Sequence, residues 1–300
     1  MATFFMNAAP IKGAEPVLLE RRAVALTDEL VLNIVRMPGG RFLMGDSKGS
    51  GQKDERPVRN VSIEPFWATT RELSVGAFTA FVEATGYQMG NSCWVYDTRW
   101  IERVGLNWRA PGYKQEQNHP VVCVTWHDAQ AFIKWARRTS GIKWRLPSEA
   151  EWEFAARGGS TGTYYWGEEI QPLCEHANAA DKQTKIHHPT FAVNDCDDGY
   201  YTTSPTGAFL PNPWGLYDVY GNVWEWVEDC WNSTYRGAPD NGSPWLTGDC
   251  TRRGFRGGGW GDIPRFARSS IRNRSAATSR KDDIGFRLVV SDRALSTERE

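Results

Sequence analysis

The sequence lacks an excess of charge of either sign and lacks any long apolar run. Its 300 residues include 35 lysines and arginines against 36 aspartates and glutamates, a formal net charge of −1. Proteins that bind nucleic acid or an anionic membrane through their overall charge carry a basic excess, so neither partner is expected and binding must come from a local site. No apolar stretch approaches the roughly 20 residues that a membrane-spanning helix needs, so no membrane span is expected.

Cysteine is scarce and lacks the spacing of a metal site. The six cysteines include no Cys-x-x-Cys pair and no Cys/His pairing at zinc spacing, so disulfides fit them better than a metal. The simplest connectivity joins each cysteine to its neighbour in the sequence. Disulfides imply a periplasmic or otherwise extracytoplasmic protein, whereas six reduced, partly buried thiols would suit a cytoplasmic one. The cysteines are Cys93, Cys123, Cys174, Cys196, Cys230 and Cys250.

Regular secondary structure is expected to be limited. The sequence contains 29 glycines and 16 prolines, which interrupt helices and strands, and 15 tryptophans, which favour an aromatic core. The fold class expected is therefore α+β with much coil. Residues 1–25 are expected to be a loose N-terminal segment, residues 26–293 a single domain, and residues 294–300 a tail.

Three helices have clear start and stop signals. Thr125 and Asp128 form a variant of the capping box, and apolar residues at helical spacing then predict a helix to about Thr139. Two further helices are predicted, one from Ser148 to just before Gly158 and one from near Ser74 to Gly86. Short strands rich in β-branched and aromatic residues are predicted at Leu30–Arg36, Arg41–Gly45, Val61–Phe66, Phe255–Trp260 and Gly285–Val290.

Six segments, in order and at plausible spacing between residues 30 and 291, resemble the formylglycine-generating enzyme (sulfatase-modifying factor) family. They read MPGGRFLMG, HPVVCVTW, RLPSEAEWEFAAR, GLYDVYGNVWEW, RGGGW and GFR, and they begin at Met37, His119, Arg145, Gly215, Arg256 and Gly285. The resemblance implies the fold of that family, a compact α+β variant of the C-type lectin fold that is poor in regular structure. The coil-rich core expected from composition agrees with it.

The resemblance also implies two structural Ca²⁺ sites, built from the oxygen ligands that this hard cation prefers. The first would use the carboxylates of Asp218 and Glu225 with the backbone carbonyls of Gly221 and Val223. The second would use the side chains of Asn178 and Asp198 with the carbonyls of Ala179 and Tyr200. From spacing alone, Asp218 and Glu225 would instead satisfy backbone donors in a buried loop.

The cysteine pair that the family's enzyme uses to bind copper is absent. No cysteine follows Cys250, and Asp262 falls close to where the first cysteine of the pair would lie. A carboxylate cannot replace a thiolate as a ligand of Cu(I). No copper is expected, and formylglycine generation by the copper mechanism is not expected either.

The segment that forms the pocket in the family is rich in arginine and aromatic residues. Arginine suits a carboxylate or phosphate, and aromatic rings can cover a ligand, so a small-molecule or peptide ligand is expected there. The alternative is a network of structural ion pairs, for which Arg268, Arg272 and Arg287 are the best candidates. The predicted ligand-binding residues are Trp260, Asp262, Arg265, Phe266 and Arg272.

Three functions fit these features. The first is an extracytoplasmic tailoring or maturation enzyme or accessory factor, resembling cysteine-less relatives associated with pyoverdine maturation and nitrite reductase. The second is a non-catalytic lectin-like recognition protein of the kind that retroelements diversify. The third is formylglycine generation by an altered mechanism. No nucleophile with a neighbouring base is visible in the sequence, so no catalytic residue is predicted.

Overall fold

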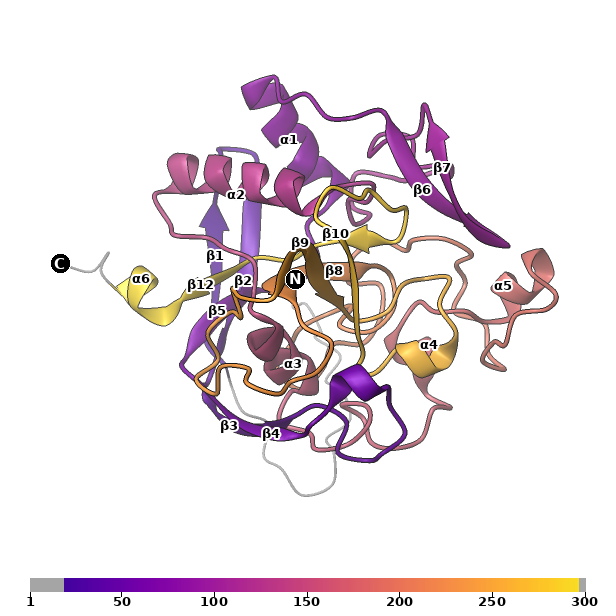
Figure 1. Ribbon diagram of the computed structural model, residues 1–300. Coiled ribbons are helices and arrows are strands. Elements are labelled where there is room, and N and C mark those ends of the chain that lie inside the picture. The colour runs from indigo at the N-terminus through magenta and orange to yellow at the C-terminus, as the bar shows by residue number, and fades with distance from the viewer. Residues whose placement is uncertain (1–18, 297–300) are drawn as a thin grey trace, which may run out of the picture.

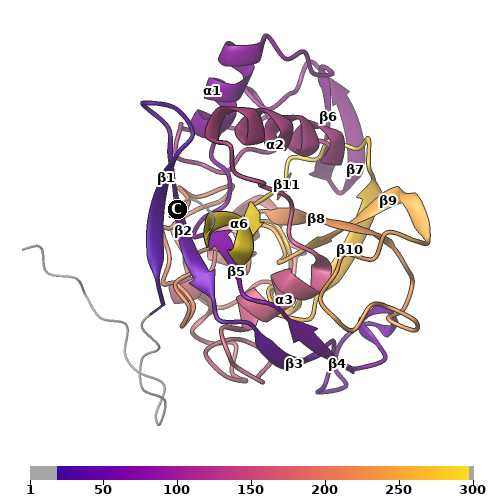
Figure 2. The same ribbon diagram turned by 90° about the vertical axis from the view of Figure 1, so that its left-hand side faces the viewer.

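A computed structural model describes residues 19–296 of the chain. Its first sheet joins the two ends of the domain in the order β1-β2-β5-β12, and all three pairings are antiparallel. The strands are β1 (Arg21–Ala25), β2 (Val31–Met37), β5 (Phe66–Thr69) and β12 (Val289–Ser291). In Figure 2, β1 and β2 lie at the left side of the molecule, β5 lies near its middle, and β9 and β10 of the second sheet lie at the right.

The second sheet has the order β10-β9-β8-β11. It consists of β8 (Trp224–Trp231), β9 (Asp249–Arg256), β10 (Arg272–Ala276) and the two-residue strand β11 (Ile284–Gly285), which pairs in parallel with β8. The segments that contain the predicted ligand residues connect these strands. The second sheet therefore positions the candidate site.

Two hairpins and the helices surround the sheets. The hairpins are β3 (Gly40–Met44) with β4 (Arg59–Ile63), and β6 (Ser92–Asp97) with β7 (Arg99–Val104). The helices are α1 (Val75–Thr85), α2 (Trp126–Ser140), α3 (Glu149–Arg157), α4 (Leu173–His176), α5 (Lys182–His187) and α6 (Asp292–Ser296), with 3₁₀ turns at Lys53–Glu55 and Pro264–Phe266. Helices α1 and α2 lie at one end of the molecule and the β3–β4 hairpin lies at the other (Figure 1).

The three predicted helices are confirmed, together with their caps. Thr125 accepts a hydrogen bond from the Asp128 backbone, and the Asp128 carboxylate accepts one from the Thr125 backbone. Ser148 and Glu151 repeat this box at the start of α3. Each of the three helices ends at a glycine in the left-handed conformation, which costs glycine no steric penalty.

Several predicted boundaries were wrong. Residues 21–25 fall in the segment expected to be loose, yet they form β1 and pair with β2. The strand predicted at 61–66 is divided between β4 and β5, which belong to different sheets. The strand predicted at 255–260 is the end of β9 and stops at Arg256, because Gly257 and Gly258 adopt positive φ. Residues 1–18 and 297–300, parts of the expected loose segment and tail, lie outside the described residues.

The core is aromatic, as the composition predicted. Phe132 of α2 has ring contacts, with centroids 5.3–6.2 Å apart, to Phe78, Phe81, Trp135 and Phe286. A second group of buried residues surrounds α3. In the described part of the chain, no helix is both long enough and apolar enough to cross a membrane.

All six cysteines form disulfides between sequence neighbours, Cys93–Cys123, Cys174–Cys196 and Cys230–Cys250. The predicted connectivity is confirmed, and the alternative of six reduced thiols does not describe this structure. No sulfur of the chain remains as a free thiol.

Candidate functional site

The residues predicted for the two Ca²⁺ sites meet at a tight turn before β8. Asp218, Gly221 and Asn222 all have positive φ, with values of 54°, 72° and 54°. The Asn222 backbone donates to the carbonyl of Asn178 at 2.7 Å. A Cβ atom at position 221 would lie 2.0 Å from that carbonyl oxygen, so only glycine fits there. The turn thereby brings the first predicted site next to the second.

Asp218 has the character of an unsatisfied cation ligand. Its side chain is buried, and its Oδ2 accepts a hydrogen bond from the Gly207 backbone at 2.6 Å. Its Oδ1 is buried and has no hydrogen-bond partner among the described residues. Burial raises the pKa of Asp218 to about 6, although the Gly207 bond and the Arg287 charge oppose the shift. A bound cation would supply the missing partner of Oδ1.

Glu225 is placed differently from Asp218. Its carboxylate receives two hydrogen bonds of 2.6 Å from the Arg287 guanidinium and one of 2.8 Å from the indole of Trp152. Glu225 therefore already has partners, but they are side chains and not the backbone donors of the spacing-based alternative, which describes Asp218 Oδ2 only. Of the two oxygens of Glu225, Oε1 accepts only one hydrogen bond, from Arg287. One lone pair of Oε1 therefore remains for a cation.

Three of the four residues predicted for the second site contact one another, through backbone N–H groups. The Asp198 carboxylate accepts hydrogen bonds from the backbones of Ala179 at 3.1 Å and Tyr200 at 2.8 Å. The buried Oδ1 of Asn178 finds no hydrogen-bond partner within residues 19–296. Burial is the main reason that the pKa of Asp198 is raised to about 7, and the nearby charge of Asp181 adds to it.

Asp181 was not predicted from the sequence. It is fully buried, and its Oδ2 accepts a hydrogen bond from the Asp198 backbone at 2.6 Å. Potential ligand atoms of Cys174, Asp181 and Asp198 lie within 4.8 Å of one another. The Cys174 sulfur is bonded to Cys196, so it is not available as a thiolate and the oxygen donors define the chemistry of this group.

The arginines of the predicted ligand segment are mostly structural. Arg272 is 2% exposed and binds Glu149 at 2.6 and 2.8 Å, so the structure does not bear out its expected place in a ligand pocket. Arg268 pairs with Glu55 in the same bidentate way. Arg265 is exposed and lies over the ring of Phe266, with its guanidinium carbon 5.1 Å from the ring centroid.

Asp262 lies in the loop between β9 and β10 and is held by two hydrogen bonds. Its Oδ2 accepts hydrogen bonds from the Gly259 backbone at 2.9 Å and from the indole of Trp224. Burial raises its pKa to about 6. A Cβ built on Gly259 would lie 3.5 Å from Asp262 Oδ2 and 3.3 Å from the Cβ of Asp283, so these two aspartates converge on one point.

The sequence interpretation missed the residues that complete this region. The Trp260 indole and the Tyr113 hydroxyl both donate to the carbonyl of Asp282, at 3.3 and 2.5 Å. The ring of Tyr201 packs against Trp260 with centroids 6.0 Å apart. The adjacent acids Asp282 and Asp283, just before the GFR motif, were the signal available in the sequence. The acidic aromatic site is defined here as Tyr113, Tyr201, Trp260, Asp262, Asp282 and Asp283.

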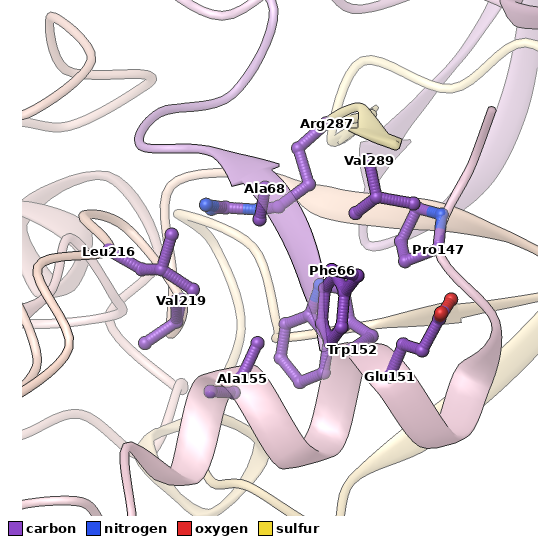
Figure 3. A pocket seen from close by; sticks show the side chains of 11 residues that line it. Phe66, Ala68, Pro147, Glu151, Trp152, Ala155, Leu216, Val219, Arg287 and Val289 are labelled. Atoms are coloured by element: carbon purple, nitrogen blue, oxygen red, sulfur yellow. The ribbon is translucent and has the colours of Figure 1, made fainter. Parts of the chain in front are cut away.

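A small buried cavity elsewhere has no such chemistry. It lies between α3 and β5 and is bounded mainly by apolar side chains (Figure 3), among them Phe66, Trp152, Leu216 and Val219. Its charged neighbours Arg287 and Glu151 are paired with Glu225 and Arg145. The cavity is a packing gap in the core and offers no polar group to a ligand.

The fold and site define a lectin-type α+β domain with oxygen-rich loops, three disulfides and no thiol at the family's copper position. The chain belongs to the family described as "Sulfatase-modifying factor enzyme 1-like domain", whose model matches residues 21–292. It is 34% identical over 288 residues to the formylglycine-generating enzyme of Streptomyces coelicolor, covering 85% of this chain and 88% of that protein. It is 32% identical to the inactive C-alpha-formylglycine-generating enzyme 2 of Bos taurus, covering 91% and 92%.

Solved structures agree with this assignment. PvdO from Pseudomonas aeruginosa superposes with a TM-score of 0.74 at 32% identity and covers 93% of this chain and 100% of that one. Variable protein 1 of Treponema denticola superposes with a TM-score of 0.68 at 19% identity, covering 92% and 100%. The second likeness concerns the fold alone. The predicted fold class is confirmed.

Proposed function

We propose that this chain is an extracytoplasmic tailoring or maturation enzyme, or an accessory factor for one, that works without the copper chemistry of formylglycine generation. One observation carries the proposal: every cysteine is in a disulfide, and the segment in which the resemblance expects the copper cysteines contains Asp262 and no cysteine. Copper chemistry of that type needs a thiolate ligand. The likeness to PvdO over its whole length supports a function outside sulfatase activation.

We further propose that two Ca²⁺ ions stabilise the loops around the site. The unpartnered oxygens of Asp218 and Asn178, each unsatisfied within the described chain, support this proposal. The ligands would be the eight residues predicted above, with Asp181 in support of the second ion. The three disulfides support a periplasmic or otherwise extracytoplasmic location, because such bonds persist in oxidising compartments.

A direct assay tests the loss of formylglycine chemistry. The purified protein is incubated with a Cys-x-Pro-x-Arg peptide, with and without copper, and the thiol and the aldehyde are quantified by mass spectrometry. The formylglycine-generating enzyme of Streptomyces coelicolor serves as the positive control. We expect no aldehyde from this chain. Copper-stimulated aldehyde formation would refute the proposal and establish the altered-mechanism alternative.

A second experiment tests the tailoring role. Small molecules and peptides from a strain that lacks the gene are compared with those from the parent strain by untargeted mass spectrometry. We expect a precursor that accumulates in the deletion strain and is consumed when the purified protein, alone or with extract of the parent strain, is added. Identical profiles in both strains would contradict a tailoring role and favour the recognition-protein alternative, for which the likeness to Variable protein 1 provides only a shared fold.

A further inference from the structure

We propose that the acidic aromatic site binds the positively charged end of an organic ligand, an ammonium or guanidinium group on a short apolar stem. The inference rests on the proposed function, because it names the chemistry of the ligand at the same site. It also reverses the expectation from the sequence, in which the arginines of this segment were to bind a carboxylate or phosphate.

The first support is an unsatisfied buried carboxylate. Asp282 is 4% exposed, and its Oδ1 has no hydrogen-bond partner in the part of the chain that the structure describes. The Oδ1 of the adjacent Asp283 is buried in the same way and likewise lacks a partner among those residues. A buried acceptor without a donor costs the folded state the desolvation of that group. A cationic N–H donor from a ligand would remove this cost.

The second support is the local charge balance. Lys281 is the neighbouring cation, and its charge acts on all three carboxylates of the site. Its ammonium lies 4.0 Å from the centroid of the Trp100 ring. One ammonium faces three carboxyl groups, so the ionised site has a negative excess. Burial and mutual repulsion raise the pKa of Asp282 to about 8, which a bound cation would reverse.

The arginines cannot change this balance. Arg268 and Arg272 are committed to the buried carboxylates of Glu55 and Glu149. Arg280 forms an ion pair with Asp128, with its Nη2 atom 3.2 Å from Oδ2 of the carboxylate. Each of these three guanidinium groups is paired with a carboxylate outside the acidic aromatic site, so none of the three is left to bind an anionic ligand or to neutralise the aspartates of that site.

The third support is the aromatic wall. The ring of Tyr113 packs edge-on against Trp260, with centroids 5.6 Å apart and an interplanar angle of 76°. Tyr201 meets Trp260 at 68° from another segment. Aromatic faces attract ammonium and guanidinium groups and cover their methylene stems. The three aspartates do not form a group with ligand atoms within 4.8 Å of one another among the described residues, so the arrangement suits an organic cation better than a single metal ion.

The site also has open space beside it. Apart from Gly261 itself and its chain neighbours Trp260 and Asp262, no heavy atom of residues 19–296 lies within 4 Å of a Cβ built on Gly261. Both of these side chains are partly exposed. A ligand can therefore approach Trp260 and Asp262, at the edge of the acidic aromatic site, and a larger side chain at position 261 would obstruct it.

Matched small probes test the proposal. n-Butylguanidinium and n-butylammonium are compared with n-butanol and butyrate, which also have a chain of four carbon atoms but are neutral or negative, in buffer with saturating Ca²⁺. Dissociation constants are measured by ligand-observed NMR and by tryptophan fluorescence. We expect at least one cation to bind about tenfold more tightly than n-butanol, and butyrate to bind no better than n-butanol. Equal or tighter binding of butyrate would overturn the proposal.

Variants locate the effect. The double variant Asp282→Asn/Asp283→Asn should lower the affinity for the cation to that for n-butanol, while Asp28→Asn, on an exposed turn, should leave it unchanged. Gly261→Leu keeps all three carboxylates and should weaken cation binding by obstruction. Unchanged cation affinity in a folded double variant, or displacement of the cation by 1 mM MgCl₂, would overturn the proposal. Aldehyde formation in the peptide assay would contradict the proposed function alone, so the two failures are distinguishable.

Discussion

At the scale of single residues, charges in this protein fall into two groups. Buried arginines such as Arg256, Arg272 and Arg287 have carboxylate partners, and such pairs hold coil segments that lack regular hydrogen bonding. Buried acids such as Asp218 and Asp282 have an oxygen with no partner in the described chain. The paired arginines serve the fold. The acids with an unpartnered oxygen indicate what the protein binds.

Replacement of Asp282 should stabilise the protein at alkaline pH. Its folded pKa of about 8, raised mainly by burial and then by Asp283, lies far above the ordinary value near 4. The folded state therefore binds more protons than the unfolded state between these values, and the free energy of unfolding falls as pH rises through this range. Asp282→Asn removes the titrating group. It should therefore raise the free energy of unfolding at pH 8.5 by on the order of 1–3 kcal/mol.

Urea unfolding at pH 8.5 and at pH 5 measures this effect. The variant should be more stable than the parent at pH 8.5, with a much smaller difference at pH 5. A variant that is less stable at pH 8.5 would mean that the Asp282 carboxylate serves the fold rather than a ligand.

Replacement of Arg272 should destabilise the fold because its partner stays buried. Arg272→Ala removes two charged hydrogen bonds from the buried Glu149 carboxylate and leaves it, as a charged partner, the longer contact with Arg256 at 3.4 Å, which we expect to cost about 3–5 kcal/mol. Arg252→Ala, which removes an exposed pair with Asp249, should cost less than about 1 kcal/mol. Chemical denaturation of both variants makes the comparison, and equal small effects would contradict the structural role assigned to Arg272.

At the scale of elements, calcium should control the stability of the turn before β8. Exchange of CaCl₂ for EGTA should lower the melting temperature by about 5 °C or more, because a ligand at 100 times its Kd stabilises by about 2.7 kcal/mol. Asp218→Asn and Asn178→Ala should each lose part of this shift, since each removes an oxygen that is unpartnered in the described structure. The Asp28→Asn control should keep it. The same melting temperature in Ca²⁺ and EGTA would argue against both sites.

The Cys230–Cys250 disulfide should contribute strongly to the stability of the second sheet. It joins β8 to β9 across a separation of 20 residues, a loop size for which the chain-entropy model gives about 3 kcal/mol. Cys230→Ala/Cys250→Ala should lower the free energy of unfolding by about that amount in urea titrations. A loss below about 1 kcal/mol would mean that the hydrogen bonds of the sheet hold this connection without the crosslink.

Elements with local signals could be predicted from the sequence, and those that depend on distant partners could not. Helices α1, α2 and α3 could be predicted because the N-cap residue and the terminating glycine of each helix lie in one short stretch of sequence. Their N-caps are Ser74, Thr125 and Ser148. Strand β11 has two residues and exists because β8 lies beside it. The hairpin of β6 and β7 was missed because its polar and aromatic residues show no simple alternation.

The candidate site divides in the same way. The calcium ligands follow from the resemblance, residue by residue, because they occupy two short motifs. Asp282 could not be assigned because Tyr113 and Trp260 reach its carbonyl only through the tertiary fold. Arg272 was assigned to the ligand for the converse reason, since its partner Glu149 lies 123 residues away in the sequence.

At the scale of the whole molecule, the first sheet determines when the domain can be completed. Strand β5 ends at Thr69, but its partner β12 begins at Val289, and Arg36 of β2 binds Asp292 at 2.7 Å. During synthesis, β5 therefore keeps an unpaired edge until nearly all of the domain has emerged from the ribosome. An unpaired strand edge can pair with strands of other chains and aggregate, so we expect the growing chain to need a chaperone. The first sheet is therefore completed only after synthesis of nearly the whole domain, an order of events that is compatible with folding after export, as the proposed extracytoplasmic location would require.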